Sequence, residues 1–395
     1  MWCVLVPRMS NYFSKYCSLI SSAEQLAYCQ QASSLGDLLL CIKQLWCCTQ
    51  LSDDELLGEI SRLNQIPIAT SDFQLAGMWL PYRYQPKRRL VNWLIPVGHA
   101  TEPFQDEYIS RCRQQLFNQI IQPCSSLEFA QQQAGCLPDI QPAGFIFHLS
   151  RCGSTLISGC LSELESTCVF SESPLLTELL LDNNLSFDEQ RTLLKSFINL
   201  QAATFPDRPH MIIKWNAWDI FRWELIRGLY PTVPTIFLVR DPVEIVASHQ
   251  RSVGRHMSGD PVLADVNPVF KSQLSDQRLF DKQIQILHSL LQVMDEKRAG
   301  PKIMVVDYRQ LCVANIPSIL AFLVCEVDEL GFLKIQERMQ FHSKTPGRIF
   351  VVDSMTKQQS VTLNEQEKIQ ACLMPVYNQL IRMAHKPLGV VIDVC

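Results

Sequence analysis

The sequence lacks both an excess of positive charge and a long uncharged apolar run. Its 35 Lys and Arg residues are balanced by 39 Asp and Glu residues, giving a formal net charge of −4. Proteins that hold a nucleic-acid backbone need a basic field, so we expect no nucleic-acid partner, and any anion site must be a local pocket. The stretch from Ile316 to Cys325 is about half of the ~20 residues that a spanning helix needs. We therefore expect no membrane span.

Metal-site spacing and a targeting segment are also missing. The 16 cysteines are scattered, without paired CxxC units or a His/Cys cluster, so we expect no metal. Disulfide-stapled secreted proteins are short and dense in cysteine, and this chain is neither. The N-terminus meets Pro7, Arg8 and Lys15 soon after a short apolar start, which is not the order of a signal peptide or a signal anchor. These features predict buried, reduced thiols and a cytoplasmic protein.

What the sequence does contain is enough apolar material for a large core, in one or two domains. Hydrophobic residues make up 47% of its 395 residues. Residues 1–140 carry no chemical motif: 21–57 has helical apolar spacing, and 79–97 is aromatic and broken by prolines, which favours extended segments. A run of glutamines at 131–133, followed by glycine and prolines, resembles a linker. We therefore predict a mainly helical N-terminal accessory region, 1–140, and a second domain, 141–395.

From residue 144 onward, short apolar runs alternate with helical stretches. The runs predicted as strands are 144–148, 168–170, 211–213, 235–239 and 302–306. Alternation at this spacing is typical of a parallel sheet with helices on both faces. The second domain is therefore predicted to have an α/β fold.

The sharpest motif is the segment FIFHLSRCGSTLIS, in which an apolar strand runs through a short turn into a helix. Such a turn points backbone N–H groups and the positive end of a helix at one spot. Gly153 allows close approach of an anion, Ser154 and Thr155 add hydroxyl donors, and Arg151 adds a charge. An ordinary strand-to-helix turn is the alternative. The pattern predicts the anion-binding loop of a P-loop NTPase-like fold.

The loop lacks the lysine of a nucleotide-hydrolysing P-loop. The pattern of such a loop is GxxxxGK[ST], in which the lysine reaches the β- and γ-phosphates. Here His148 occupies the position of the first glycine, and Ser154 occupies the position of the lysine. The loop therefore suits a nucleotide whose transferred group is not a γ-phosphate. Two alternatives stay open: a small-molecule or nucleotide kinase with Asp241 as its magnesium-binding acid, and a protein that binds a nucleotide without catalysis.

A second motif lies in IFLVRDPVEIVASHQRS. Arg240 and Asp241 end an apolar strand, Pro242 begins a helix, and Ser248 follows about two turns later. Because ligands of open α/β sheets bind at the carboxyl ends of the strands, Arg240 should face the same crevice as the first loop. Arginine and a hydroxyl are suitable donors for a second phosphate. Taken alone, RDP marks only the start of a helix.

Together the two motifs resemble the sulfotransferase superfamily over roughly residues 143–310. The family loop [PS][RK]SG[ST]T is matched from Ser150 to Thr155, with cysteine where serine is commoner, and its RDPxxxxxS motif is matched from Arg240 to Ser248. The resemblance implies binding of 3′-phosphoadenosine 5′-phosphosulfate (PAPS) without a metal. The residues it assigns to this co-substrate are Ser150, Arg151, Cys152, Gly153, Ser154, Thr155, Arg240 and Ser248.

The site pattern is closest to the branch of the tyrosylprotein sulfotransferases. That branch has a general-base glutamate just beyond the second strand and a lysine at the end of the next, and Glu172 and Lys214 occupy comparable places. The resemblance thus implies that Glu172, Arg151 and Lys214 are catalytic. From the residues alone, Glu172 also suits a helix cap and Lys214 an exposed strand end. If Glu172 is only a cap, His148 is the next candidate base.

The family also supplies a late basic loop at the 3′-phosphate. The segment 342–348 is the basic, glycine-containing stretch late in this chain, so Lys344 and Arg348 are candidates, with a plain surface turn as the alternative. The 307–309 stretch, Asp-Tyr-Arg, departs from the family's strand motif and is interpreted as scaffold. Cys152 is predicted to be reactive, because a neighbouring arginine and a helix N-terminus lower the pKa of a thiol.

The predicted function is transfer of a sulfuryl group from PAPS to an acceptor hydroxyl. The acceptor is a small molecule, a sugar or a peptide, and the sequence does not decide among them. Loops that contact acceptors are the least constrained part of such folds. The irregular segment 253–278 is therefore the predicted place of acceptor contacts.

Overall fold

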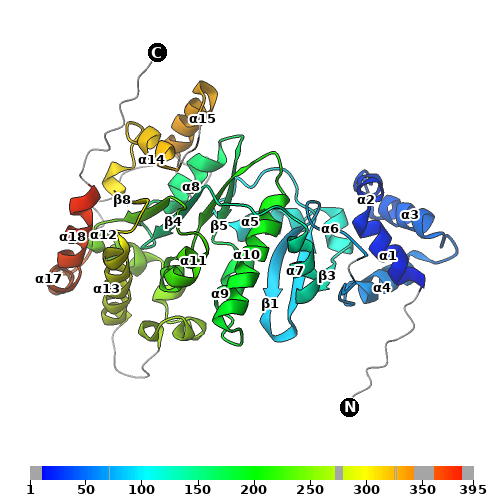
Figure 1. Ribbon diagram of the computed structural model, residues 1–395, viewed down its shortest axis with the longest axis horizontal. Helices are drawn as coiled ribbons and strands as arrows, with labels where there is room; N and C mark the ends of the chain where they lie inside the picture. The colour runs from blue at the N-terminus through cyan, green and yellow to red at the C-terminus, as the bar shows by residue number, and fades with distance from the viewer. Residues whose placement is uncertain are drawn as a thin grey trace.

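Two β-sheets organise the protein, one antiparallel with three strands and one parallel with five. In Figure 1 the small sheet lies between a group of N-terminal helices and the large sheet with its own helices. The computed structural model describes residues 11–70, 72–271, 279–323, 325, 327–341 and 360–384.

In the described chain the N-terminal region begins with four short helices, of which the second and third lie in the stretch 21–57 that is predicted to be helical from its apolar spacing. The four helices are α1 (Asn11–Ser21), α2 (Ala23–Gln30), α3 (Leu35–Trp46) and α4 (Asp53–Leu63). Local sequence sets their starts: Ser22 and Ser34 accept backbone N–H groups at the caps of α2 and α3, and Ser52 forms a capping box with Glu55 on α4. Helices α2, α3 and α4 therefore begin where a side chain accepts an N–H group of the first turn.

The proline-broken aromatic segment forms the small sheet. The elements are β1 (Leu80–Gln85), η1 (Pro86–Arg88), β2 (Leu90–Leu94), α5 (Gln105–Arg113), α6 (Leu116–Ile120), β3 (Cys124–Ser126) and α7 (Leu127–Gly135). The glutamines at 131–133 lie in α7, so the linker interpretation is wrong. The Gln133 side chain is buried, accepts the N–H groups of Leu75 and Ala76, and donates to the carbonyl of Phe73. Its amide thus satisfies backbone groups of a turn at residues 73–76.

The large sheet confirms the predicted α/β fold with a P-loop NTPase-like parallel sheet. Its strands are β4 (Gly144–His148), β5 (Thr167–Ser171), β6 (His210–Lys214), β7 (Thr235–Val239) and β8 (Ile303–Asp307), in the spatial order β5-β6-β4-β7-β8. All pairings in it are parallel. The first strand along the chain is therefore central, with neighbours that come from later crossovers on either side. Open α/β sheets bind ligands at this switch point.

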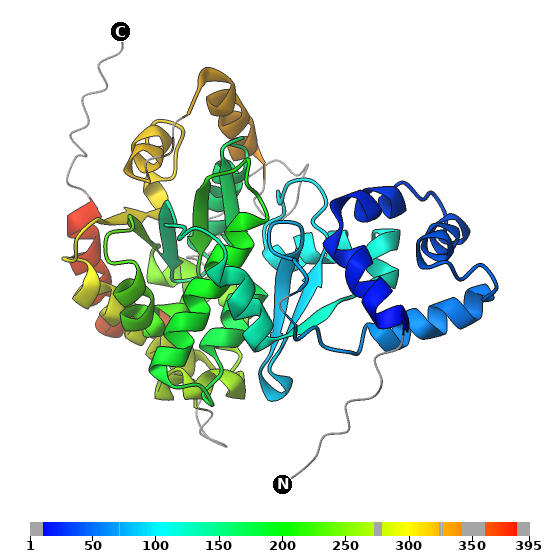
Figure 2. The same cartoon turned by 45° about the vertical axis from the view of Figure 1, so that its right-hand side comes forward.

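Helices cover both faces of the large sheet, as Figures 1 and 2 show. Neighbouring residues of each strand point to opposite faces, so Phe145 and Phe147 belong to one buried cluster and Ile146 to the other. The elements around the sheet are α8 (Ser154–Ser162), α9 (Pro174–Leu180), α10 (Phe187–Ala203), η2 (Ala217–Arg222), α11 (Trp223–Leu229), α12 (Pro242–Arg251), η3 (Arg255–Met257), η4 (Pro261–Asp265), η5 (Pro268–Phe270), α13 (Leu279–Lys297), η6 (Tyr308–Gln310), α14 (Ile316–Phe322), α15 (Glu329–Gln340), α17 (Leu363–Cys372) and α18 (Met374–Ala384).

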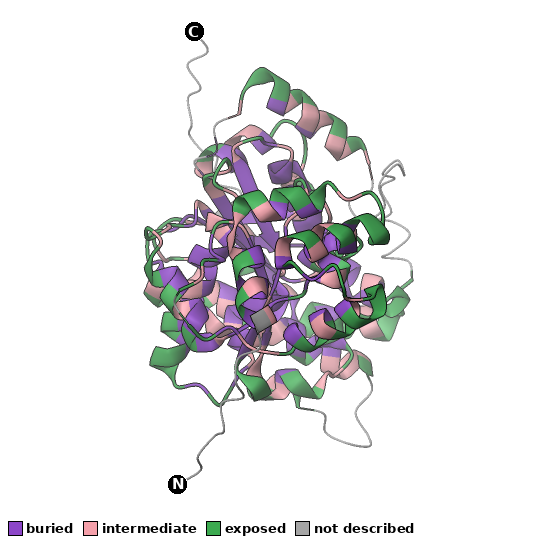
Figure 3. Ribbon diagram, turned by 90° about the vertical axis from the view of Figure 1, so that its right-hand side faces the viewer, coloured by how far each residue is buried: buried purple, intermediate pink, exposed green. Residues whose placement is uncertain are grey.

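The larger buried cluster runs from the N-terminal helices through the small sheet to the large one. It includes Phe13 of α1, Trp93 of β2, Phe237 of β7 and Leu380 of α18. Figure 3 shows this buried interior across the molecule. The N-terminal region is therefore packed against the α/β part through a shared core, and the division at residue 140 stays a prediction.

Two further expectations concern cysteines and membranes. The cysteines in the described part of the chain are free, and most of them are buried. Among the described helices, none combines the length and apolar character required to cross a bilayer.

Candidate functional site

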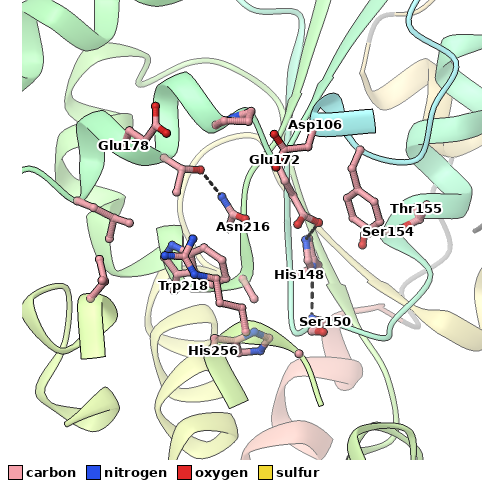
Figure 4. A pocket seen from close by; sticks show the side chains of 18 of the residues that line it. Asp106, His148, Ser150, Ser154, Thr155, Glu172, Glu178, Asn216, Trp218 and His256 are labelled. Carbon is pink, nitrogen blue, oxygen red and sulfur yellow. Dashed lines mark hydrogen bonds and ion pairs between the residues drawn. The ribbon is translucent and has the colours of Figure 1, made fainter. Parts of the chain in front are cut away.

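A cavity of about 1020 Å³ opens at the carboxyl edge of the large sheet. Because the parallel strands all end there, residues from several strand ends line it: Ser150 after β4, Glu172 after β5, Trp218 after β6, Arg240 after β7 and Tyr308 after β8. Figure 4 shows many of these side chains pointing into one space. The two sequence motifs, about 90 residues apart, therefore meet at one site.

The loop after β4 is held in an uncommon backbone conformation. Ser150, Arg151 and Gly153 have φ values of 68°, 56° and 86°, in the left-handed region that only glycine adopts at little cost. A Cβ on Gly153 would lie 2.5 Å from Leu311 Cδ1 and 2.9 Å from Tyr308 Cδ2, so no side chain fits there. The loop ends at the N-terminus of α8. The strained turn and the first residues of α8 thus face the cavity together.

Most of the loop side chains assigned to the co-substrate line the cavity, but Cys152 does not. Its side chain is fully buried in the second apolar cluster. Burial raises the pKa of the Cys152 thiol to about 11. The prediction of a reactive thiol is therefore wrong, because desolvation outweighs the nearby positive charge. Only the backbone of Cys152 is available to a ligand.

The two motif arginines, Arg151 and Arg240, connect the loop to neighbouring segments through hydrogen bonds. Arg151 donates through Nη2 to the carbonyl of Ser252 at 2.7 Å, and Arg240 donates through Nη1 to the carbonyl of Arg151 at 3.1 Å. The second contact ties the end of β7 to the loop after β4. Both arginines line the cavity, and Ser248 lies at its edge on α12. Arg240 and Ser248 of the second motif therefore line the same cavity as the loop.

Arg240 has further partners that the sequence did not reveal. Its Nε donates to Glu244 Oε2 at 2.7 Å, and its Nη2 also pairs with this carboxylate. Its guanidinium carbon lies 3.9 Å from the centre of the Tyr308 ring. Tyr308 was interpreted as scaffold, yet it lines the cavity. Arg240 thus reaches the site as a buried ion pair supported on an aromatic face.

Glu172 and His148 line the cavity, and the buried Lys214 contacts Glu172. Glu172 Oε1 lies 3.1 Å from Lys214 Nζ and 3.4 Å from His148 Nε2. The Lys214 side chain is fully buried, so the exposed-strand-end interpretation fails. The cap interpretation of Glu172 fails too, because Ser173 is the N-cap of α9 and has no side-chain capping bond. Glu172 adopts a φ of 55°, and its N–H donates to the carbonyl of Lys214 at 2.7 Å.

The partners of Glu172 fix its charge. Burial raises its pKa, but the Lys214 cation and His148 outweigh burial and hold the pKa well below its usual range. His148 Nδ1 accepts the N–H of Ser150 at 3.0 Å, which leaves Nε2 as the ring nitrogen that carries a proton and faces Glu172. His148 therefore orients the carboxylate, and Glu172 is the group that can take a proton.

Several cavity residues had no signal in the sequence. Phe104 precedes α5 in the N-terminal region, and its ring centre lies 4.6 Å from Lys214 Nζ. Asn216 donates to Thr177 Oγ1 at 2.7 Å, beside the cavity. Trp218 and His256 pack with ring centroids 5.8 Å apart. Only His256 lies in a segment for which acceptor contacts were predicted.

Asp219, behind Asn216, gives the fold a pH dependence. It accepts the backbone N–H of Asn216 at 2.8 Å and its side-chain amide at 3.0 Å, and burial raises its pKa from 3.8 to about 7. The folded protein therefore retains a proton that the unfolded chain releases above about pH 4. Stability consequently falls as the pH rises from about 4 to about 7.

We expect Asp219→Asn to remove this dependence of the unfolding free energy on pH. The amide oxygen still accepts hydrogen bonds from Asn216, and the amide has no charge to bury. Urea unfolding at about pH 5 and about pH 8 should show a loss of roughly 1–3 kcal/mol in the wild type and a smaller loss in the variant. Asp54→Asn, on the exposed start of α4, is the control and should keep the wild-type slope. Equal slopes for all three proteins would show that Asp219 is ionised throughout.

Three further predicted residues remain, and Asp241 is not among the residues that line the cavity. Lys344 and Arg348 lie outside the described residues. Asp241, the acid of the kinase alternative, is the N-cap of α12, where it accepts the N–H of Val243 at 2.8 Å. Within the described ranges, no group of three or more His, Cys, Asp or Glu side chains could hold a metal ion.

Comparisons with known proteins find similarity only among solved structures. No protein-family model matches the sequence, and no curated protein matches it. The chain is similar to the sulfotransferase domain from the curacin biosynthetic pathway, at 15% identity and a TM-score of 0.34 over 62% of this chain and 97% of that one. It is also similar to the sulfotransferase STF9 from Mycobacterium avium, at 10% identity and a TM-score of 0.39 over 64% and 78% of the two chains. At this level of similarity, residue roles have to come from the geometry of the cavity.

Proposed function

We propose that this chain is a sulfotransferase that moves a sulfuryl group from PAPS to an acceptor hydroxyl. The observation that carries the proposal is the meeting of a strained anion-type loop, 150–153, with Glu172 in one cavity, where the buried Lys214 pairs with the Glu172 carboxylate. A loop of this kind binds a phosphate-like group through backbone N–H groups. A carboxylate beside a buried lysine supplies both a proton acceptor and a charge for the leaving group.

Each group has a defined part in the transfer. The acceptor oxygen attacks sulfur, the new S–O bond forms, and the bond from sulfur to the bridging oxygen breaks, leaving adenosine 3′,5′-bisphosphate. Glu172 takes the acceptor's proton, and Lys214 and Arg151 stabilise negative charge on the departing oxygen. Lys214 pairs with Glu172. A phosphosulfate that draws Lys214 toward itself would raise the pKa of Glu172 and make it a better base.

Two alternatives are less well supported. A kinase would need a loop lysine, which this loop lacks, and a free magnesium-binding acid, whereas Asp241 caps a helix. A protein that only binds a nucleotide would have no need to bury Lys214 against a carboxylate, because an unused buried ion pair seldom adds stability.

Titration calorimetry with two nucleotides tests the proposed co-substrate. We expect adenosine 3′,5′-bisphosphate to bind without a metal, and to bind at least about tenfold more tightly than ATP with Mg²⁺, because Arg240 and Ser248 offer a second anion site. Adenosine 5′-monophosphate, which lacks the 3′-phosphate, is the matched control and should bind weakly. Tighter binding of ATP with Mg²⁺ would favour the kinase.

The finer features of the proposal follow the same resemblance. The Glu172–Lys214 pair supports a site like that of the tyrosylprotein sulfotransferases, and we include Lys344 and Arg348 as further contacts of the 3′-phosphate. The free cysteines support a cytoplasmic location. Residues 1–140 act as an accessory region, and the partner is a hydroxyl-bearing acceptor rather than a nucleic acid.

A further inference from the structure

The acceptor end of the cavity is built mainly by the N-terminal region and α9. In Figure 4, Asp106 and Glu178 lie beyond Glu172 as seen from Ser150 of the loop. We call this part the acceptor end. With Asp106 and Glu178 we group Trp218 and the other lining residues within 83–107, 177–184 and 255–265.

Carboxylates outnumber cations among these residues. The acids are Asp106, Glu107, Glu178, Asp182 and Asp265, and the cations are Arg83, Lys87 and Arg255. A cleft lined by one sign of charge concentrates ligands of the opposite sign and repels those of its own. The acceptor end therefore disfavours an anion.

The arginines of the acceptor end are already paired. Arg83 lies 2.6 Å from Glu178 and 3.1 Å from Asp106. Arg255 pairs at 2.5 Å with Asp260, which is not a lining residue. Of the cations that line the described cavity at this end, that leaves Lys87, which is exposed in the turn between β1 and β2. A carboxylate, phosphate or sulfate on the acceptor would find no free arginine to bind.

The polar groups that do lack partners at this end are uncharged. Trp218 Nε1 and His256 Nε2 are buried and make no hydrogen bond, although both side chains line the cavity. Trp218 is 6% exposed and His256 is 3% exposed. Burial, together with the nearby His249, lowers the pKa of His256 to about 3, so its imidazole is neutral. Buried polar atoms without partners are costly, and hydroxyl groups of a ligand would satisfy both.

We propose that the acceptor is a hydroxyl compound without negative charge, held through its hydroxyl groups by Trp218 and His256, and that an amine-bearing acceptor is preferred to an acidic one. This assignment rests on the proposed function, since it names the substrate class of the same site. It is carried by two independent observations: the paired state of the arginines, and the buried polar atoms of Trp218 and His256 that have no hydrogen-bond partner.

Charge-matched ligands test the assignment. The probes are tyramine, tyrosol and 4-hydroxyphenylacetate for phenols, and glucosamine, glucose and glucuronate for sugars. Binding to the protein saturated with adenosine 3′,5′-bisphosphate is measured by saturation-transfer NMR. In at least one set, the anionic probe (4-hydroxyphenylacetate or glucuronate) should bind about fivefold to tenfold more weakly than the cationic probe (tyramine or glucosamine). Added salt should reduce this difference in affinity. An anion that binds as well as the cation in both sets, or no binding by any probe, would overturn the assignment.

A variant distinguishes local charge from a general effect. Asp106→Asn, at an exposed position, removes one partner of Arg83. In this variant the ratio between the affinities of the cationic and the anionic probe should fall about twofold to threefold. Asp54→Asn, on α4, changes the net charge by the same amount and should leave this affinity ratio unchanged. If the bisphosphate binds but the probes show no preference, the acceptor assignment fails while the proposed function stands. If the bisphosphate itself does not bind, the proposed function fails.

Discussion

Replacing Glu172 with Gln is expected to slow sulfuryl transfer by about 100-fold or more. The amide keeps the shape of the side chain, and its oxygen can still face Lys214 and His148, but it cannot take the acceptor's proton. Single-turnover decay of radiolabelled PAPS, measured with and without an accepted hydroxyl compound, gives the rate of the chemical step. Binding of adenosine 3′,5′-bisphosphate should change little.

The structure adds a stability effect to this prediction. Lys214 is fully buried, and its carboxylate partner is lost in the variant, so Glu172→Gln should also lower the free energy of unfolding by about 3 kcal/mol. The double variant Glu172→Gln/Lys214→Met removes the unpaired charge and should recover stability but not the rate. Glu165→Gln, which breaks an exposed pair with Lys334, is the matched control for the substitution. A normal rate per folded molecule in Glu172→Gln would remove Glu172 from the chemistry.

Replacing Arg240 with Ala is expected to weaken binding of adenosine 3′,5′-bisphosphate by about 10- to 100-fold, or roughly 1.5–3 kcal/mol. The change removes the charge next to the second anion position and also the bond to the carbonyl of Arg151. It leaves the buried Glu244 carboxylate without its arginine, where it would repel a phosphate. Titration calorimetry measures the affinity, and thermal melting checks that the variant is folded.

The Arg240 prediction has an internal control in Glu244. Glu244→Gln keeps Arg240 supported on Tyr308 and removes a negative charge, so this variant should bind the bisphosphate at least as tightly as the wild type. In Arg240→Ala/Glu244→Gln, part of the lost affinity should return, because the unpaired carboxylate is gone. Wild-type affinity in Arg240→Ala would show that the second motif only begins a helix.

Local sequence was sufficient for the loop and the sheet. The alternation of apolar strands with helices predicted a parallel sheet, because buried parallel strands require continuous apolar runs. The glycine at 153 and the hydroxyls after it predicted the turn into α8, where Gly153 has a φ of 86° and no room for a Cβ. These features depend on residues close together in the chain, so their pattern can be read without knowing the packing.

The sequence also determined which charged residues would meet at the carboxyl edge. Glu172, Lys214 and Arg240 each follow a predicted strand, and parallel strands end at one edge. The sequence could not determine how these charges are paired. That Lys214 is wholly buried against Glu172, or that Arg240 is shared between Glu244 and Tyr308, depends on side-chain positions set by the packed sheet.

Tertiary structure alone decided the environment of Cys152 and which residues of the N-terminal region reach the cavity. The thiol has an arginine and a helix end beside it in the sequence, but the fold turns it into the apolar cluster, where burial raises its pKa. Phe104 and Arg83 have no motif, yet packing of the small sheet against α9 brings them to the cavity. Contacts between segments so distant in sequence carry no local pattern, because they arise only when apolar faces with no partner of their own are buried together.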